Sequence, residues 1–91
     1  MNLVEGSEFT LVELETCVDD SVSRPRVRPL KPFPTSIWVE FPRALRENNP
    51  IGTRFRSDVV VCQKHNNDGS LRGPLYLRAI TKTIVPINHD S

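Results

Sequence analysis

The residues whose types could support nucleophilic catalysis are two cysteines, Cys17 and Cys62, and two histidines, His65 and His89. A catalytic cysteine needs a histidine within hydrogen-bonding reach and an electropositive, partly exposed setting. Cys62 lies three residues before His65, a spacing that puts the two side chains on opposite faces of a strand. Cys17 is far from both histidines in the sequence. The spacing therefore argues against a cysteine nucleophile.

Acid–base and metal chemistry have equally little support. Glu13 and Glu15 are two residues apart and would share one face of a strand, as an acid–base pair requires. Such a pair is more typical of the solvated face of a sheet. The sequence has no HxH, CxxC or HExxH spacing, and Asp68-Gly69 resembles a calcium loop only in composition. We therefore expect no enzyme activity, no metal and no cofactor.

Basic and aromatic residues form the remaining constellation. Small β-barrels bind single-stranded nucleic acid by stacking bases on aromatic rings while cations follow the phosphates. The sequence supplies both kinds of residue, on an extended loop and on expected strands. The candidate binding residues are Arg24, Arg26, Arg28, Trp38, Arg54, Arg56, Tyr76 and Arg78.

Internal pairing is the competing interpretation of these arginines. Arg54 and Arg56 could meet Glu13, Glu15 or Glu40 across neighbouring strands. Each such pair would contribute under about 1 kcal/mol to stability. Both interpretations stay open at the level of sequence.

Two features could instead bind protein. Trp38 is typical of a core or dimer contact, because protein interfaces favour tryptophan. Residues 26–32 fit the basic-x-x-Pro-x-x-Pro pattern that SH3 grooves recognise. The pattern is short and arises often by chance, so a structural loop or strap is the favoured interpretation.

Charge is distributed unevenly along a chain whose net charge is only +1. Residues 1–23 carry six carboxylates and no Lys or Arg. Residues 24–56 carry eight basic groups against two carboxylates, Glu40 and Glu47. Such asymmetry indicates internal pairing, head-to-tail assembly or a basic face for an anionic partner.

Length and composition favour one small domain. The 91 residues allow a single modest core, and eight prolines argue against long helices. Because the sequence shows no hydrophobic N-terminal segment, we expect reduced thiols and a cytoplasmic location. No apolar run is long enough for a membrane span. A homo-oligomer is expected to add the core that one chain lacks.

The first extended segment is residues 8–18, which we expect to form a strand. Its apolar residues fall on both faces of a strand, which predicts a bulge near Leu11-Val12. A helix is the alternative, because Leu11, Leu14 and Val18 also fit a helical stripe.

The middle of the chain predicts a loop, a strand and a helix. Residues 24–35 are expected to be a Pro/Arg-rich loop, because they contain four prolines within ten residues. Residues 36–41 alternate in polarity like a strand. Residues 42–48 are the expected short helix, since Pro42 fits the first helical position and Asn49-Pro50 ends it.

The last third predicts a β-hairpin. Residues 53–64 and 75–87 are β-rich, and the polar loop between them contains Asp68-Gly69. The polarity pattern changes near Ala79, which predicts a bulge or corner there. Residues 88–91 are expected to be a frayed tail.

These elements predict a mainly β protein, with residues 1–91 as one domain. The expected form is a strongly bent antiparallel sheet or partly closed β-barrel of SH3- or OB-like size. An open antiparallel sheet with the helix packed on one side is the alternative. The predicted function is a non-enzymatic module that binds nucleic acid or another anionic macromolecule through a basic and aromatic face. The alternative is a protein-interaction or accessory subunit acting through self-association or sheet-edge docking.

Overall fold

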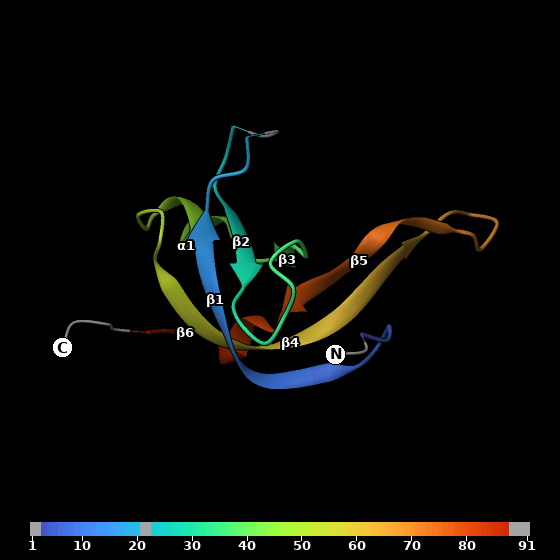
Figure 1. The fold of residues 1–91 in the computed structure, drawn as a ribbon, viewed down its shortest axis with the longest axis horizontal. Helices are drawn as coiled ribbons and strands as arrows, with labels where there is room; N and C mark the ends of the chain where they lie inside the picture. Colours follow the sequence, from blue (N-terminus) through green and yellow to red (C-terminus); the bar gives the residue numbers. More distant parts are fainter. Residues whose placement is uncertain (1–2, 21–22, 88–91) are drawn as a thin grey trace.

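Six strands form one sheet in the order β2-β1-β4-β5-β3, with β6 paired on β4 (Figure 1). The computed structural model describes residues 3–20 and 23–87. The elements are β1 (Glu8–Cys17), β2 (Arg26–Pro29), β3 (Val39–Glu40), α1 (Arg43–Glu47), β4 (Arg54–His65), β5 (Leu71–Ala79), the 3-10 helix η1 (Thr81–Thr83) and β6 (Val85–Pro86). The predicted mainly β class is confirmed, and the sheet is not closed. The tail predicted at 88–91 lies outside the described residues.

The predicted hairpin is confirmed as β4 and β5. Its loop is shorter than expected, covering residues 66–70 instead of 65–74. Asp68 and Gly69 tighten it: the Asp68 carboxylate accepts the N–H of Ser70 (2.9 Å), and Gly69 takes a φ of 88°. The sequence Gly73-Pro74, which resembles a strand terminator, instead lies inside β5 at a shift of register. A bulge is one of the few places where a sheet accepts proline.

The predicted bulge in β1 is also confirmed. The register between β1 and β4 shifts between Phe9 and Val12, and Leu11 takes a φ of 55°. The shift turns Leu11 outward, 70% exposed, and turns Val12 and Leu14 into the core. The helical alternative for this segment is wrong, because β1 is a continuous strand.

The loop predicted at 24–35 needs correction, because β2 lies within it. The residues of β2 pair with the end of β1, from Cys17–Arg26 to Leu14–Pro29. A proline is tolerated here because β2 is an edge strand. The following residues carry Phe33 into the core, where its ring packs edge-on against Phe9 at 5.2 Å between centroids. The segment is therefore part of the packed structure.

The strand predicted at 36–41 is reduced to β3, although Ile37, Val39 and Phe41 are all buried as the alternation indicates. The expectation of a wholly antiparallel sheet is wrong at this edge, because β3 pairs parallel to β5. Between β3 and β5 the chain passes through α1 and β4, and this crossover lets both strands run in one direction. The short helix is confirmed as α1, with Pro42 at its N-cap rather than at its first helical position.

The corner predicted near Ala79 is present. β5 ends there, η1 turns the chain, and β6 returns to pair with the start of β4. Asp58 in the middle of β4 fixes this corner through its backbone. Its N–H donates to Oγ1 of Thr83 (2.9 Å), and its carbonyl accepts the N–H of Ile80 (2.9 Å).

The core is one cluster of apolar side chains on the concave side of the sheet. It draws on every strand except the short β6, with the Phe41 and Phe55 rings 5.0 Å apart at its centre. Its buried members are Val12, Leu14, Val27, Phe33, Ile37, Val39, Phe41, Phe55, Val59, Val61, Leu77 and Ala79.

The strained position Leu11 gives the first testable prediction. Replacing Leu11 by glycine removes the steric cost of a positive φ and loses little burial. We expect Leu11→Gly to raise the free energy of unfolding by roughly 0.5–1 kcal/mol in a denaturant titration. The neighbouring exposed residue Thr10 gives the control, because its φ is not positive. Thr10→Gly should lower the free energy of unfolding by a similar amount. Equal destabilisation by both variants would contradict the assignment of strain to Leu11.

Candidate functional site

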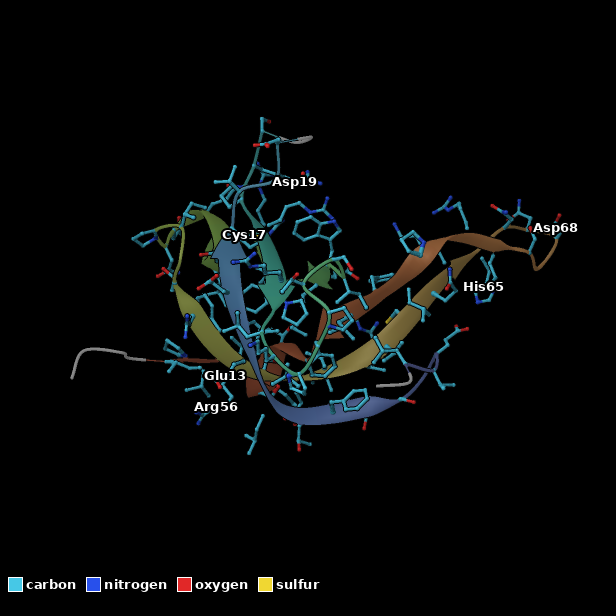
Figure 2. All side chains as sticks on the ribbon, viewed as in Figure 1. Glu13, Cys17, Asp19, Arg56, His65 and Asp68 are labelled. Carbon is cyan, nitrogen blue, oxygen red and sulfur yellow. The ribbon has the colours of Figure 1, made fainter. Side chains whose placement is uncertain are left out.

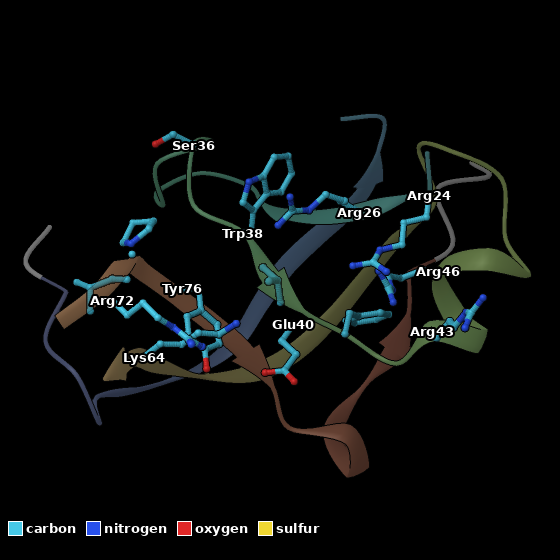
Figure 3. A pocket seen from close by; sticks show the side chains of 15 residues that line it. Arg24, Arg26, Ser36, Trp38, Glu40, Arg43, Arg46, Lys64, Arg72 and Tyr76 are labelled. Atoms are coloured by element: carbon cyan, nitrogen blue, oxygen red, sulfur yellow. The ribbon is translucent and has the colours of Figure 1, made fainter. Parts of the chain in front are cut away.

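The two edges of the open sheet approach each other next to β3. β2 and β3 are the edge strands in the sheet order, and the guanidinium carbon of Arg26 on β2 lies 4.1 Å from the ring centroid of Trp38. A groove of about 820 Å³ opens at this place (Figure 3). Among the residues described, its charged and aromatic lining is Arg24, Arg26, Trp38, Glu40, Phe41, Arg43, Arg46, Lys64, Arg72 and Tyr76.

One wall of the groove, here called the body wall, belongs to the compact part of the sheet. It consists of Arg24, Arg26, Trp38 and the two arginines of α1, Arg43 and Arg46. These α1 residues are three apart and therefore project from one side of the helix.

The body wall is held together by contacts of its own side chains. Arg26 forms an ion pair with Asp19 (2.9 Å) and also stacks on Trp38. Arg46 donates through Nη1 to the carbonyl of Pro25 (3.2 Å), which fixes α1 against the start of β2. The Nε of Arg46 is buried and has no hydrogen-bond acceptor within residues 3–20 and 23–87. These contacts hold the side chains of the body wall in place.

The opposite wall, the arm wall, is carried by the β4–β5 hairpin and consists of Lys64, Arg72 and Tyr76. Lys64 and Arg72 are cross-strand partners, so their side chains leave the same face of the hairpin. The Lys64 ammonium lies 5.8 Å from the Tyr76 ring centroid. Burial raises the pKa of the Tyr76 phenol, and Cys62 and Glu40 raise it further. The ring therefore stays neutral through the physiological range.

The electrostatics of the groove are strongly one-sided. Six cations line it against one carboxylate, Glu40. Two of the cations are neutralised nearby, Arg26 by its ion pair and Arg43 by Glu47 (2.7 Å). For the other four, Arg24, Arg46, Lys64 and Arg72, no ion pair occurs within the described part of the chain. Such a surface attracts anions.

The eight residues predicted from sequence divide into two equal sets. The structure brings Arg24, Arg26, Trp38 and Tyr76 together in the groove. It places the other four away from the groove lining, at Arg28, Arg54, Arg56 and Arg78.

Arg28 and Arg54 share a partner on the outer face of the sheet. Both guanidinium groups contact Glu15, at 2.9 Å and 3.2 Å. Hydrogen bonds from these two arginines hold the pKa of Glu15 below its usual value, with Arg28 the stronger influence, despite the opposing effect of burial. This is the cross-strand pairing that the competing interpretation expected for Arg54.

Arg56 and Arg78 are exposed. Arg56 is the cross-strand neighbour of Glu13, and Figure 2 shows the two side chains at the same part of the sheet. Arg78 lies on β5 opposite Glu40 of β3.

Sequence reasoning missed four groove cations, Arg43, Arg46, Lys64 and Arg72. Two patterns in the sequence could have indicated these cations. Arg43 and Arg46 have helical spacing within the one expected helix. Lys64 and Arg72 flank the predicted hairpin loop at positions that pair once the loop is closed.

The catalytic candidates are dispersed. Cys17 and Cys62 are both free thiols, and burial raises the pKa of Cys17, which keeps it in the inert protonated form. His65 contacts Glu5 (3.1 Å) instead of a cysteine. Within residues 3–20 and 23–87, no group of three or more His, Cys, Asp or Glu side chains could hold a metal ion.

Comparison with models of protein families, with curated proteins and with solved structures finds no match for this chain. In the described part of the structure, no helix is both long enough and apolar enough to cross a membrane.

The shared carboxylate Glu15 predicts a pH-dependent contribution to stability. The pKa of Glu15 is lower in the folded protein than in the unfolded chain. Its ion pairs therefore add fully to the free energy of unfolding at a pH above the pKa of the unfolded chain, and this addition is lost as the pH falls through the pKa of the folded protein. Glu15→Gln should therefore lower the free energy of unfolding by about 1 kcal/mol at neutral pH. The difference from the wild type should shrink below about pH 4. Glu13→Gln is the matched control on the same face and should have a smaller effect. A deficit for Glu15→Gln that does not change with pH would refute the assignment.

Proposed function

We propose that this protein is a non-enzymatic binding module that holds nucleic acid, or a related anionic macromolecule, in the groove between the body wall and the arm wall. The observation that supports the proposal is the convergence of six cations and two half-buried aromatic rings, Trp38 and Tyr76, on one groove that contains a single carboxylate. Polyanions are attracted to such a surface because neutralised phosphates release their counterions.

The shape of the sheet supports the same proposal. Its edges approach at the contact between Arg26 and Trp38, and this approach supports the proposal of a partly closed β-barrel of SH3- or OB-like size. Small barrels of this kind commonly bind extended polymers across an open face. The groove lies across β3, at the opening between the two edges (Figure 3).

A salt titration tests this function. A labelled single strand of about 10 nucleotides should bind with an affinity that falls as salt rises from about 50 to about 200 mM. With three or four phosphates neutralised, the log–log slope should be about −2 to −3. Absence of binding at low salt, or binding without a negative slope, would refute the proposal.

Charge reversal locates the binding surface. The double variant Arg24→Glu with Arg72→Glu removes one cation from each wall and should weaken binding by about tenfold or more, flattening the slope by about 1.4. The double variant Lys31→Glu with Lys82→Glu changes the net charge equally at exposed positions outside the groove. It should weaken binding by less than about threefold. If the two double variants lose affinity equally, binding responds only to the net charge of the protein and not to the groove.

Self-association or sheet-edge docking is the second candidate function, and the open edge of β5 favours it. β3 pairs with β5 only at Leu77 and Arg78, which leaves the part of β5 nearer the loop without a strand on that side among the described residues. Exposed strand edges accept additional strands, and Leu71 on this edge is 66% exposed.

Sedimentation velocity tests this second function. If the β5 edge is an interface, the average mass should rise with protein concentration, and Leu71→Lys should shift that rise to at least about tenfold higher concentration. A constant monomer mass at high concentration would remove this candidate. The exposed substitution Val85→Lys on β6 gives a matched control.

A further inference from the structure

Each wall of the groove carries one aromatic ring with a cation beside it. On the body wall the partners are Arg26 and Trp38, at 4.1 Å, and on the arm wall they are Lys64 and Tyr76, at 5.8 Å. Figure 3 shows the two rings separated within the groove, Trp38 beside β2 and Tyr76 on the hairpin side. Both side chains are only half-buried, so part of each ring remains available to a ligand.

The two kinds of residue together restrict the ligand. Cations alone would suit any polyanion, including an acidic peptide or a duplex. Flat, partly exposed rings are stabilised by contact with a planar partner, and every nucleobase offers a π-face that can stack on them. In a duplex those faces are already stacked within the helix, whereas in a single strand they are accessible. The ligand that uses both the cations and the rings is a single-stranded nucleic acid.

We infer that the groove binds a single-stranded nucleic acid with one unpaired base stacked on Trp38 and a second stacked on Tyr76. The inference rests on the proposed function and adds to it the recognition of bases in addition to phosphates.

The local contacts assign a role to each group. Arg26 is held by Asp19 and covers one face of Trp38, so the base stacks on the opposite face of the indole. Lys64 lies farther from its ring, at 5.8 Å from the Tyr76 centroid, so it packs less closely on that ring than Arg26 does on Trp38. Arg24 and Arg72, without an ion pair in the described residues, follow the phosphates on either side.

Intrinsic fluorescence tests the stacking directly, because Trp38 is the only tryptophan in the chain. Three probes are titrated: a single-stranded oligothymidylate of about 10 nucleotides, an abasic strand of the same length and charge, and a duplex of about 10 base pairs, which carries about twice the charge and would bind more tightly if charge alone set the affinity. The single strand should quench the fluorescence of Trp38. The abasic strand and the duplex should bind at least about tenfold more weakly, with little quenching.

Substitutions at Tyr76 provide a readout that does not depend on tryptophan. Tyr76→Leu should weaken binding of the oligothymidylate by about tenfold without changing the affinity for the abasic strand. Tyr76→Phe keeps the ring and should bind like the wild type. Equal unfolding midpoints in denaturant establish that both variants are folded.

The outcomes separate this inference from the function on which it rests. If the abasic strand or the duplex binds as tightly as the single strand, with a normal salt dependence, base stacking is refuted and binding to polyanions stands. The same conclusion follows if Tyr76→Leu weakens binding to both strands equally. If none of the three probes binds at low salt, the proposed function and the inference fall together.

Discussion

Asp58 forms hydrogen bonds to the bulge of β1 and to the corner after β5, the two places where the strands beside β4 change direction. Its carboxylate accepts the N–H of Leu11 at the bulge of β1, at 3.0 Å. Its backbone holds Ile80 and Thr83 at the corner that follows β5. Because both neighbours of β4 bend at this level, the sheet curves until its edges approach and Arg26 reaches Trp38. The groove thus depends on curvature that is fixed by residues outside its lining.

The uneven charge of the sequence is resolved in the fold by two different means. Acidic residues of the N-terminal third neutralise arginines on the outer face and at the rim: Glu15 binds Arg28 and Arg54, and Asp19 binds Arg26. Lys31, Arg56, Arg78 and Lys82 lie outside the groove lining, whereas the groove cations without an ion pair in the described residues belong to α1, to the hairpin and to the segment before β2. They face one another across the groove, where Glu40 is the single acidic side chain. Internal pairing and a basic face therefore coexist in this molecule.

Local patterns in the sequence predicted the features that depend on local geometry. Two-residue alternation located the bulge at Leu11, and turn chemistry located the hairpin and the ends of α1. The edge strand β2 was hidden by Pro29 within it and Pro25 just before it, whose backbone restrictions matter less at an edge. The parallel pairing of β3 and the meeting of Arg46 with Lys64 in one groove depend on a crossover and on sheet curvature. Neither leaves a periodic signal in a single sequence.

The β4–β5 hairpin extends well beyond the rest of the sheet (Figure 1), and residues 64–74 are all exposed. One side of the groove is thus built on the packed interior and the other on a twisted ribbon that its own cross-strand hydrogen bonds support. The body wall is therefore supported by the core, whereas the arm wall is supported mainly by the pairing of β4 with β5. Because the exposed end of the hairpin has few buried contacts, we expect the separation of the two walls to vary more readily than the packing of the core.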